Sequence, residues 1–209
     1  MAEFTFFHNP MSRGAIAHWA LHEAGADFDT VLVDWNDKPQ SLLDANPMGK
    51  VPTLMHHHGD HRHVVTEAAA ICHYLAETHP GAGLLPDPHE RAAYFRWLFF
   101  AAGPVEAAVT SKSMGWDVPD DKRMMAGFGT YDLTIDTLED WFKTHAFVCG
   151  DRFTMADVYV GAQVDWGMLF GSMPERDAFK AYQARVQARD AYKASHAADA
   201  KLRGENGDD

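Results

Sequence analysis

A proline interrupts a run of residues that otherwise favours a β-strand, and it restricts how this part of the chain can fold. Pro52 lies within residues 51–55, which read as a strand. Proline donates no hydrogen bond to a sheet, so a strand that carries it lies at an edge or has a special backbone geometry. A cis Val51–Pro52 bond meets this need. It turns the Val51 amide and carbonyl outward, where they can pair with a short peptide as an added strand would.

The segment before Pro52 has the pattern of a βαβ unit. Residues 4–7 are an apolar, β-favouring run, and residues 28–35 form a second strand with alternating side chains. Between them, apolar residues recur at helical spacing from Ser12, a suitable N-cap, to Gly25, a natural stop. Two strands joined through a helix predict a parallel pair with a right-handed crossover.

The segment around Pro52 predicts a short helix, a hairpin and a further helix. Residues 39–43 suit the short helix. Residues 51–56 and 62–65 read as two antiparallel strands that turn at residues 59–60, a Gly-Asp pair. Apolar residues then return to helical spacing over residues 68–79.

A stretch rich in proline and glycine, residues 80–89, divides the chain and predicts a linker. The chain after it has helical periodicity. Pro104 predicts a kink or a break within the first of these helices. The expected helices span 90–112, 122–144, about 154–170 and 175–193.

Thr154 and Asp157 have the spacing of a capping box at the start of one of these helices. In this motif the two side chains accept hydrogen bonds from each other's backbone N–H groups. We therefore interpret Asp157 as a structural residue and not as a catalytic acid.

The composition excludes several classes of protein. The formal net charge of -12, without clustered Lys and Arg, argues against nucleic acid and against an anionic membrane surface. No signal peptide or long apolar segment is evident, and Cys72 and Cys149 are too few for a disulfide framework, so we expect a cytoplasmic protein. We expect both thiols to act as small buried hydrophobes. Residues 204–209 are polar and predict a disordered tail.

Five of the thirteen histidines lie within residues 56–63 and suggest a metal site. We expect none here. The run falls where a hairpin turn is predicted, adjacent strand residues point to opposite faces, and no nearby Cys or Glu completes a ligand set. Adventitious binding of nickel or zinc is an alternative.

Two motifs around Pro52 resemble the glutathione-binding half of the cytosolic glutathione S-transferases of bacterial type. The first is Asn46-Pro47-x-Gly49-Lys50-Val51-Pro52-x-Leu54, and the second is Val64-x-Thr66-Glu67-x-x-Ala70-Ile71. The resemblance covers nearly the whole chain, and it implies an α/β thioredoxin-like domain (1–79) followed by an all-α domain (90–203).

The resemblance implies a role for each residue of the motifs in binding glutathione. Val51, beside Pro52, would pair with the cysteinyl backbone, and Lys50 would approach the glycine carboxylate. Glu67 would accept the γ-glutamyl amine, and the amide of Ala68 would receive the γ-glutamyl carboxylate. The usual serine is replaced by Ala68, which removes one hydroxyl donor. Lys38 is a weaker candidate.

The resemblance also implies that the protein holds the glutathione thiol as a thiolate. Its donor would lie at the end of the first strand, where related enzymes use Tyr, Ser or Cys. Residues 4–18 contain neither Tyr nor Cys, and the alignment register is ambiguous. We expect Ser12 to be the donor, with Asn9 second and Arg13 as an electrostatic helper. The competing interpretations are a helix N-cap for Ser12 and a turn residue for Asn9.

Together these features predict a detoxifying glutathione transferase, a homodimer that joins the thiolate to a small apolar electrophile. Glu106, Met114 and Trp116 are candidates for the electrophile pocket, with core packing as the alternative. Two other functions remain open. One is a glutathione-dependent reductase, isomerase, etherase or peroxidase, and the other is a binding module without catalysis. We expect glutathione to be the only co-substrate, and we expect no metal ion.

Overall fold

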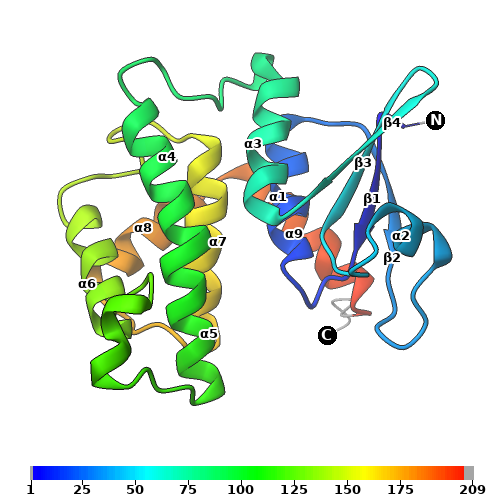
Figure 1. Cartoon of the computed structure of the whole chain (residues 1–209). Helices are drawn as coiled ribbons and strands as arrows, with labels where there is room; N and C mark the ends of the chain where they lie inside the picture. Colours follow the sequence, from blue (N-terminus) through cyan, green and yellow to red (C-terminus); the bar gives the residue numbers. More distant parts are fainter. Residues whose placement is uncertain (1, 205–209) are drawn as a thin grey trace. The chain divides into compact units, whose positions relative to one another are not determined.

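The computed structural model describes residues 2–204, and its first part is built on a four-stranded sheet (Figure 1). The order of strands is β2-β1-β3-β4. β1 and β2 are parallel, while β3 pairs antiparallel with both β1 and β4. The predicted parallel pair is thus confirmed. The strands are β1 (Phe4–His8), β2 (Phe28–Leu32), β3 (Thr53–His58) and β4 (His61–Thr66).

Local sequence signals set most boundaries in this part. α1 (Gly14–Ala24) ends where Gly25 adopts the left-handed conformation, as predicted. β3 begins directly after Pro52, because proline cannot donate to the ladder. β2 ends at Leu32, earlier than predicted, because the chain turns where Asp34 Oδ1 accepts the Asn36 amide.

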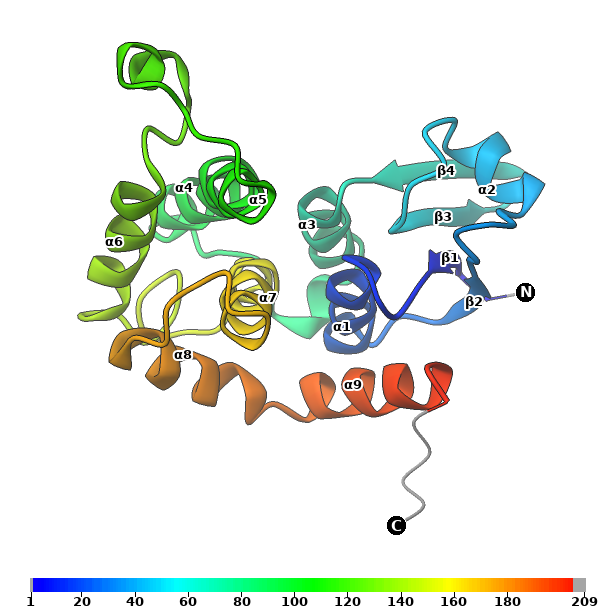
Figure 2. The ribbon, with the colours of Figure 1, turned by 90° about the horizontal axis from the view of Figure 1, so that it is seen from below.

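Helices cover both faces of the sheet (Figure 2). α1 and α3 (Ala68–Thr78) lie on one face. The short α2 (Gln40–Ala45) lies on the other, where Leu42 packs with Phe7 and Val33. α9 (Asp190–Leu202) runs beside α1.

The predicted helix over 175–193 is two helices. α8 (Asp177–Gln187) ends before Arg189, which has an extended backbone, and α9 begins at Asp190. Arg189 forms a bidentate ion pair with Glu23 of α1, with both N–O distances 2.6 Å. This pair holds the start of α9 against α1. Arg189 and Glu23 are 166 positions apart in the sequence, so helical periodicity could not reveal the pair.

The second part of the chain is helical. Pro104 lies in a π-helical turn between α4 and α5, so the predicted interruption is confirmed. The expected helix over 122–144 is shorter, because glycines precede Thr130, whose hydroxyl caps the new helix start. The elements are α4 (Arg91–Phe100), η2 (Ala101–Val105), α5 (Glu106–Met114), η3 (Asp120–Met125), α6 (Tyr131–Phe142), α7 (Met155–Leu169) and α8.

The predicted capping box at the start of α7 is confirmed. Buried Asp157 accepts hydrogen bonds from the Val148 and Thr154 amides and from the Tyr182 hydroxyl. Burial raises the pKa of Asp157 to about 6, although these donors favour the charged form. These hydrogen bonds make Asp157 a structural anchor for the loop before α7.

The chain forms two compact units. Their boundaries differ from the expected ones in the C-terminal part of the chain. Residues up to Leu85 group with those from Ala188 onward, and Pro86–Gln187 form the second unit. α9 therefore belongs with the sheet and not with the helical domain expected over 90–203. Of the expected tail, residues 205–209 lie outside the described part of the chain. None of the helices described combines the length and apolarity needed to cross a bilayer.

Candidate active site

Three chain segments meet at one end of the sheet. Phe7 of β1 pairs with Thr53 of β3, and Thr53 pairs in turn with Thr66 of β4. The segments that continue from these residues are 8–13, 50–52 and 67–68. The pairing register therefore brings together the three parts of the chain in which the sequence predicts binding and catalysis.

The Val51–Pro52 peptide bond is cis, which confirms the prediction. Within residues 2–204, neither the amide nor the carbonyl of Val51 makes a hydrogen bond. The residues on either side are fixed: the Asn46 side chain donates to Lys50 O (3.2 Å) and to Thr53 Oγ1 (3.0 Å). A rigid loop thus presents an unpaired backbone segment, which is the requirement for pairing with a peptide.

Glu67, which follows β4, has an unusual backbone conformation. Its φ is 67°, and no other residue except glycine has a positive φ in the described part of the chain. Residues in such strained conformations cluster at active sites and ligand-binding sites. No side chain caps the start of α3, so the amide of Ala68 is available to an anion. The exposed Glu67 carboxylate lies at the same position.

Two lysines flank the Val51 loop. Lys50 is exposed and directly precedes Val51, and Lys38 lies against Gly49. A Cβ added to Gly49 would come within 3.3 Å of Lys38 Nζ, and the positive φ of Gly49 (59°) also favours glycine. The fold therefore places Lys38 beside the loop, where its ammonium group can reach a carboxylate.

Ser12 does not occupy the predicted N-cap position, which belongs to Arg13. Instead, the Ser12 hydroxyl donates to Asn9 O (2.6 Å) and accepts from the amide of Gly14 (2.9 Å). Its single proton is therefore used within the loop. To stabilise a thiolate, Ser12 would have to give up the bond to Asn9.

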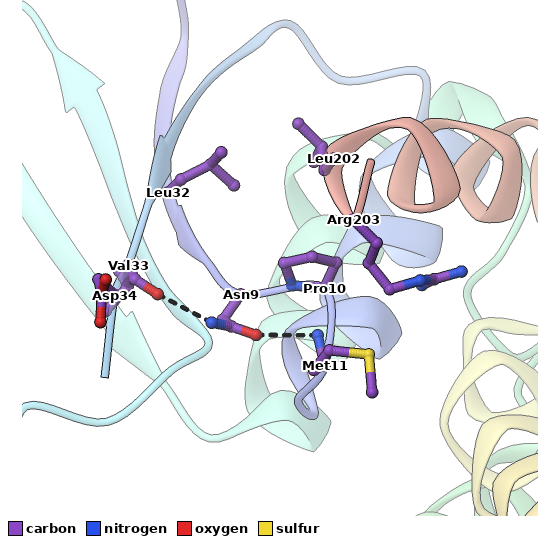
Figure 3. A pocket seen from close by; sticks show the side chains of 8 residues that line it. All are labelled: Asn9, Pro10, Met11, Leu32, Val33, Asp34, Leu202 and Arg203. Carbon is purple, nitrogen blue, oxygen red and sulfur yellow. Dashed lines mark hydrogen bonds between the residues drawn. The ribbon is translucent and has the colours of Figure 1, made fainter. Parts of the chain in front are cut away.

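Asn9 organises the same loop through an Asx turn (Figure 3). Its side chain donates to Val33 O (2.9 Å) and accepts from the amide of Met11 (2.9 Å). The amide group has two protons, and the hydrogen bonds found in the described chain use one. Asn9 thus keeps a donor where Ser12 does not. Arg13, beside them, is exposed.

A buried polar network lies behind this loop, and no pattern in the sequence predicts it. Asp199 Oδ1 of α9 accepts from His8 Nε2 (2.8 Å) and from His18 Nδ1 (2.6 Å). Burial raises the pKa of Asp199, but the hydrogen bonds from His18 and His8 outweigh it and lower the pKa to about 2. Burial lowers the pKa of His8. The residue just before Asn9 is thereby fixed to the last helix.

A cavity of about 500 Å³ lies beside the loop, between the end of β2 and the end of α9 (Figure 3). Pro10, Met11 and Leu202 form apolar parts of its wall. It is open to solvent. Its remaining lining residues are Asn9, Leu32, Val33, Asp34 and Arg203.

Comparison with known proteins agrees with this geometry. The family model for the glutathione S-transferase N-terminal domain matches residues 14–78, and the model for the C-terminal domain matches residues 104–190. The chain belongs to the glutathione S-transferase family of enzymes. The expected fold, a thioredoxin-like domain and a helical domain, is the fold of this family.

Individual members of the family are similar over most of the chain. Glutathione S-transferase GstA of Escherichia coli O157:H7 is 28% identical over 166 residues, which cover 77% of this chain and 80% of that protein. A glutathione transferase structure from Methylococcus capsulatus is 27% identical with a TM-score of 0.75, covering 95% of this chain and 99% of that one. A sphingomonad glutathione S-transferase, solved in complex with glutathione, is 26% identical with a TM-score of 0.73, covering 93% and 98%.

The residues predicted for the electrophile pocket all lie in the second unit. Glu106 begins α5 and accepts a hydrogen bond from Gln163 (2.9 Å), whereas Met114 ends α5, about 12 Å further along the helix. Trp116 lines a separate hollow of about 200 Å³ with Lys112 and Tyr131, to which neither Glu106 nor Met114 contributes. In the second unit, Trp116 therefore lines this hollow without Glu106 and Met114.

Neither cysteine has the environment of a nucleophile. Cys72 is fully buried in α3, and burial raises its pKa. Cys149 is half-buried, and burial raises its pKa to about 11. Activated thiols need a lowered pKa, so the sulfur that reacts is expected to come from glutathione.

Proposed function

We propose that this protein binds glutathione along residues 50–52 and 67–68, and transfers its thiolate to a small apolar electrophile. The observation that carries the proposal is the unpaired backbone of Val51, held next to the uncapped start of α3 by the Thr53–Thr66 pairing. An extended peptide with a terminal carboxylate satisfies both groups at once.

The charges at this end of the sheet complement those of glutathione. Its glycine carboxylate meets Lys50 and Lys38, and its γ-glutamyl amine meets Glu67. Its γ-glutamyl carboxylate meets the amide of Ala68 at a helix N-terminus, where the helix dipole contributes roughly 0.3 to 1 kcal/mol. With this orientation, the cysteinyl sulfur extends toward the loop that follows β1.

Thiolate formation needs only a modest preference for the anion. Lowering a thiol pKa from about 8.5 by two units takes roughly 2.7 kcal/mol. One charge-assisted hydrogen bond contributes about 1.5 to 3 kcal/mol. We propose that Asn9 supplies it through its remaining amide proton, or Ser12 by turning away from Asn9, and that Arg13 adds a positive charge.

We further propose that the protein acts in the cytoplasm as a homodimer and detoxifies apolar electrophiles. Two features support this setting: the low cysteine content and the similarity to bacterial glutathione transferases. Glu106, Met114 and Trp116 stay our candidates for contacts with the electrophile.

Isothermal calorimetry with glutathione tests the binding mode. Glu67→Gln should weaken binding at least tenfold, because the γ-glutamyl amine loses its anionic partner. Glu77→Gln, on the exposed side of the same helix, is the matched control and should leave the affinity unchanged. Equal affinities for both variants, or no binding by the unmodified protein, would refute the proposed site.

A further inference from the structure

The hairpin formed by β3 and β4 presents four histidines on one face. His58 pairs with His61, and His56 pairs with His63. Directly opposite residues of two strands point to the same side, and so do alternate residues of one strand. All four imidazoles therefore share a face, which we call the imidazole face (His56, His58, His61 and His63).

The fifth histidine of this run points the other way. His57 lies between His56 and His58, and its Nε2 bonds to Thr5 Oγ1 at 2.8 Å across the sheet. The hairpin thus places His57 on one face and the other four histidines of the run on the opposite face. This arrangement removes one ground on which the sequence argued against a metal site, the alternation of faces.

The imidazoles are neighbours on this face, and their side chains must rotate to bring the ligand atoms around one ion. The ring centroids of His56 and His58 are 6.0 Å apart, and those of His61 and His63 are 6.4 Å apart. Opposite Cβ atoms in such a hairpin lie about 4.5 to 5.5 Å apart. His58, His61 and His63 are exposed, so their side chains can turn toward a common ion.

A carboxylate lies at the inner end of the imidazole face. Glu3 Oε1 is 3.4 Å from His56 Nε2, and Glu3 Oε2 is 3.3 Å from His79 Nε2. The other nitrogen of His56 is bonded to the Tyr74 hydroxyl at 2.8 Å. Glu3, distant in sequence, thus supplies a carboxylate beside His56, as a ligand or as a group that orients His56.

We propose that the imidazole face binds a divalent transition-metal ion, Zn²⁺, Ni²⁺ or Cu²⁺. His58, His61 and His63 would be the ligands, and His56 and Glu3 would complete or orient the set. Neutral imidazole is a preferred ligand of these three metals. The negative net charge of the protein favours a cation, and the exposed tip leaves coordination positions for water.

The buried group of His8, His18 and Asp199 is a poorer candidate, although its ligand atoms lie within 4.8 Å of one another and those of the imidazole face do not. These atoms are already joined by hydrogen bonds, and all three residues are buried, so an ion would have to displace protons without a route from solvent. The imidazole face lies at the opposite end of β3 from Pro52. Metal binding there is independent of the proposed function.

Calorimetry and equilibrium dialysis of the untagged protein with Zn²⁺ and with Ni²⁺ test this inference. One ion should bind per chain, and His61→Asn and His63→Asn should each weaken binding at least ~10-fold. Circular dichroism should show that both variants fold, because the replaced side chains are exposed.

His57→Asn is the decisive control, because the His57 side chain bonds to Thr5 on the other face of the hairpin. This variant should keep the affinity of the unmodified protein. A histidine-rich segment that bound metal without the hairpin geometry would lose as much affinity from His57→Asn as from His61→Asn. That result, or the absence of stoichiometric binding, would overturn the proposal.

Discussion

Asp199 and His8, which are 191 positions apart in the sequence, are joined by a buried hydrogen bond of 2.8 Å between Oδ1 and Nε2. The same oxygen accepts from His18 Nδ1 of α1. One carboxylate thereby connects α9 to β1 and α1. Because His8 directly precedes Asn9, this connection also fixes one end of the loop after β1, which carries the proposed thiolate donors Asn9 and Ser12.

Removing this carboxylate should destabilise the first unit. Asp199→Ala leaves two buried imidazole N–H groups without an acceptor, and we expect a loss of about 2 to 5 kcal/mol. Asp190→Ala, a fully exposed residue of the same helix, is the control and should change stability little. Urea unfolding followed by circular dichroism measures both, and equal midpoints would contradict the role of Asp199.

The same network predicts how stability depends on pH. His8 has a pKa lowered from 6.5, so the unfolded chain binds its proton first, and the free energy of unfolding should fall as pH drops below about 6.5. Asp199, with a pKa lowered from 3.8 to about 2, adds a second loss between those values. His8→Gln should reduce the first loss, to which His22 and His56 also contribute because burial lowers their pKa, and should keep the second. Urea midpoints measured from pH 7 to 2 would show both losses.

Gly14 should be needed for close packing behind the loop. A Cβ at this position would collide with His8 Nδ1 and come within 2.9 Å of Ser12 Oγ. His8 is held by Asp199 and cannot move away, so Gly14→Ala should cost about 1 to 3 kcal/mol. Gly81→Ala, where an added Cβ meets nothing within 4 Å, is the control. Thermal unfolding of both variants should differ, and a neutral Gly14→Ala would argue against a rigid His8.

Ala68 offers a test in which activity should improve. A serine here would restore the hydroxyl that the family usually places beside the γ-glutamyl carboxylate. One such hydrogen bond contributes about 0.5 to 1.5 kcal/mol, so Ala68→Ser should lower the KM for glutathione about 3- to 10-fold. Conjugation rates with an activated aryl chloride measure it. A higher or unchanged KM would contradict the placement of the carboxylate.

Much of the fold follows from local chemistry that the sequence displays. The cis bond at Pro52, the helix stop at Gly25 and the cap at Thr154 each depend on residues within a few positions. Long-range pairings could not be predicted in this way. Asp199 with His8 and Arg189 with Glu23 join elements far apart in the chain, and they place α9 with the sheet.

The candidate site likewise has a part that the local sequence predicts and a part that depends on long-range structure. The motif predicts Val51, Pro52 and Glu67 as binding residues, and the strand register brings them to one end of the sheet. The use of the Ser12 proton could not be predicted, because it depends on how the loop turns after His8. Likewise, only the register of the hairpin reveals that four histidines share a face.

The ultraviolet absorbance of glutathione thiolate, titrated against pH in the presence of the protein, tests the central claim most directly. We predict that the bound thiol titrates near pH 6.5, about two units below the free thiol. We expect Asn9→Ala to raise this value more than Ser12→Ala, because Asn9 keeps an unused amide proton. A bound thiol that titrates near 8.5, or no binding of glutathione at all, would contradict a thiolate-activating transferase.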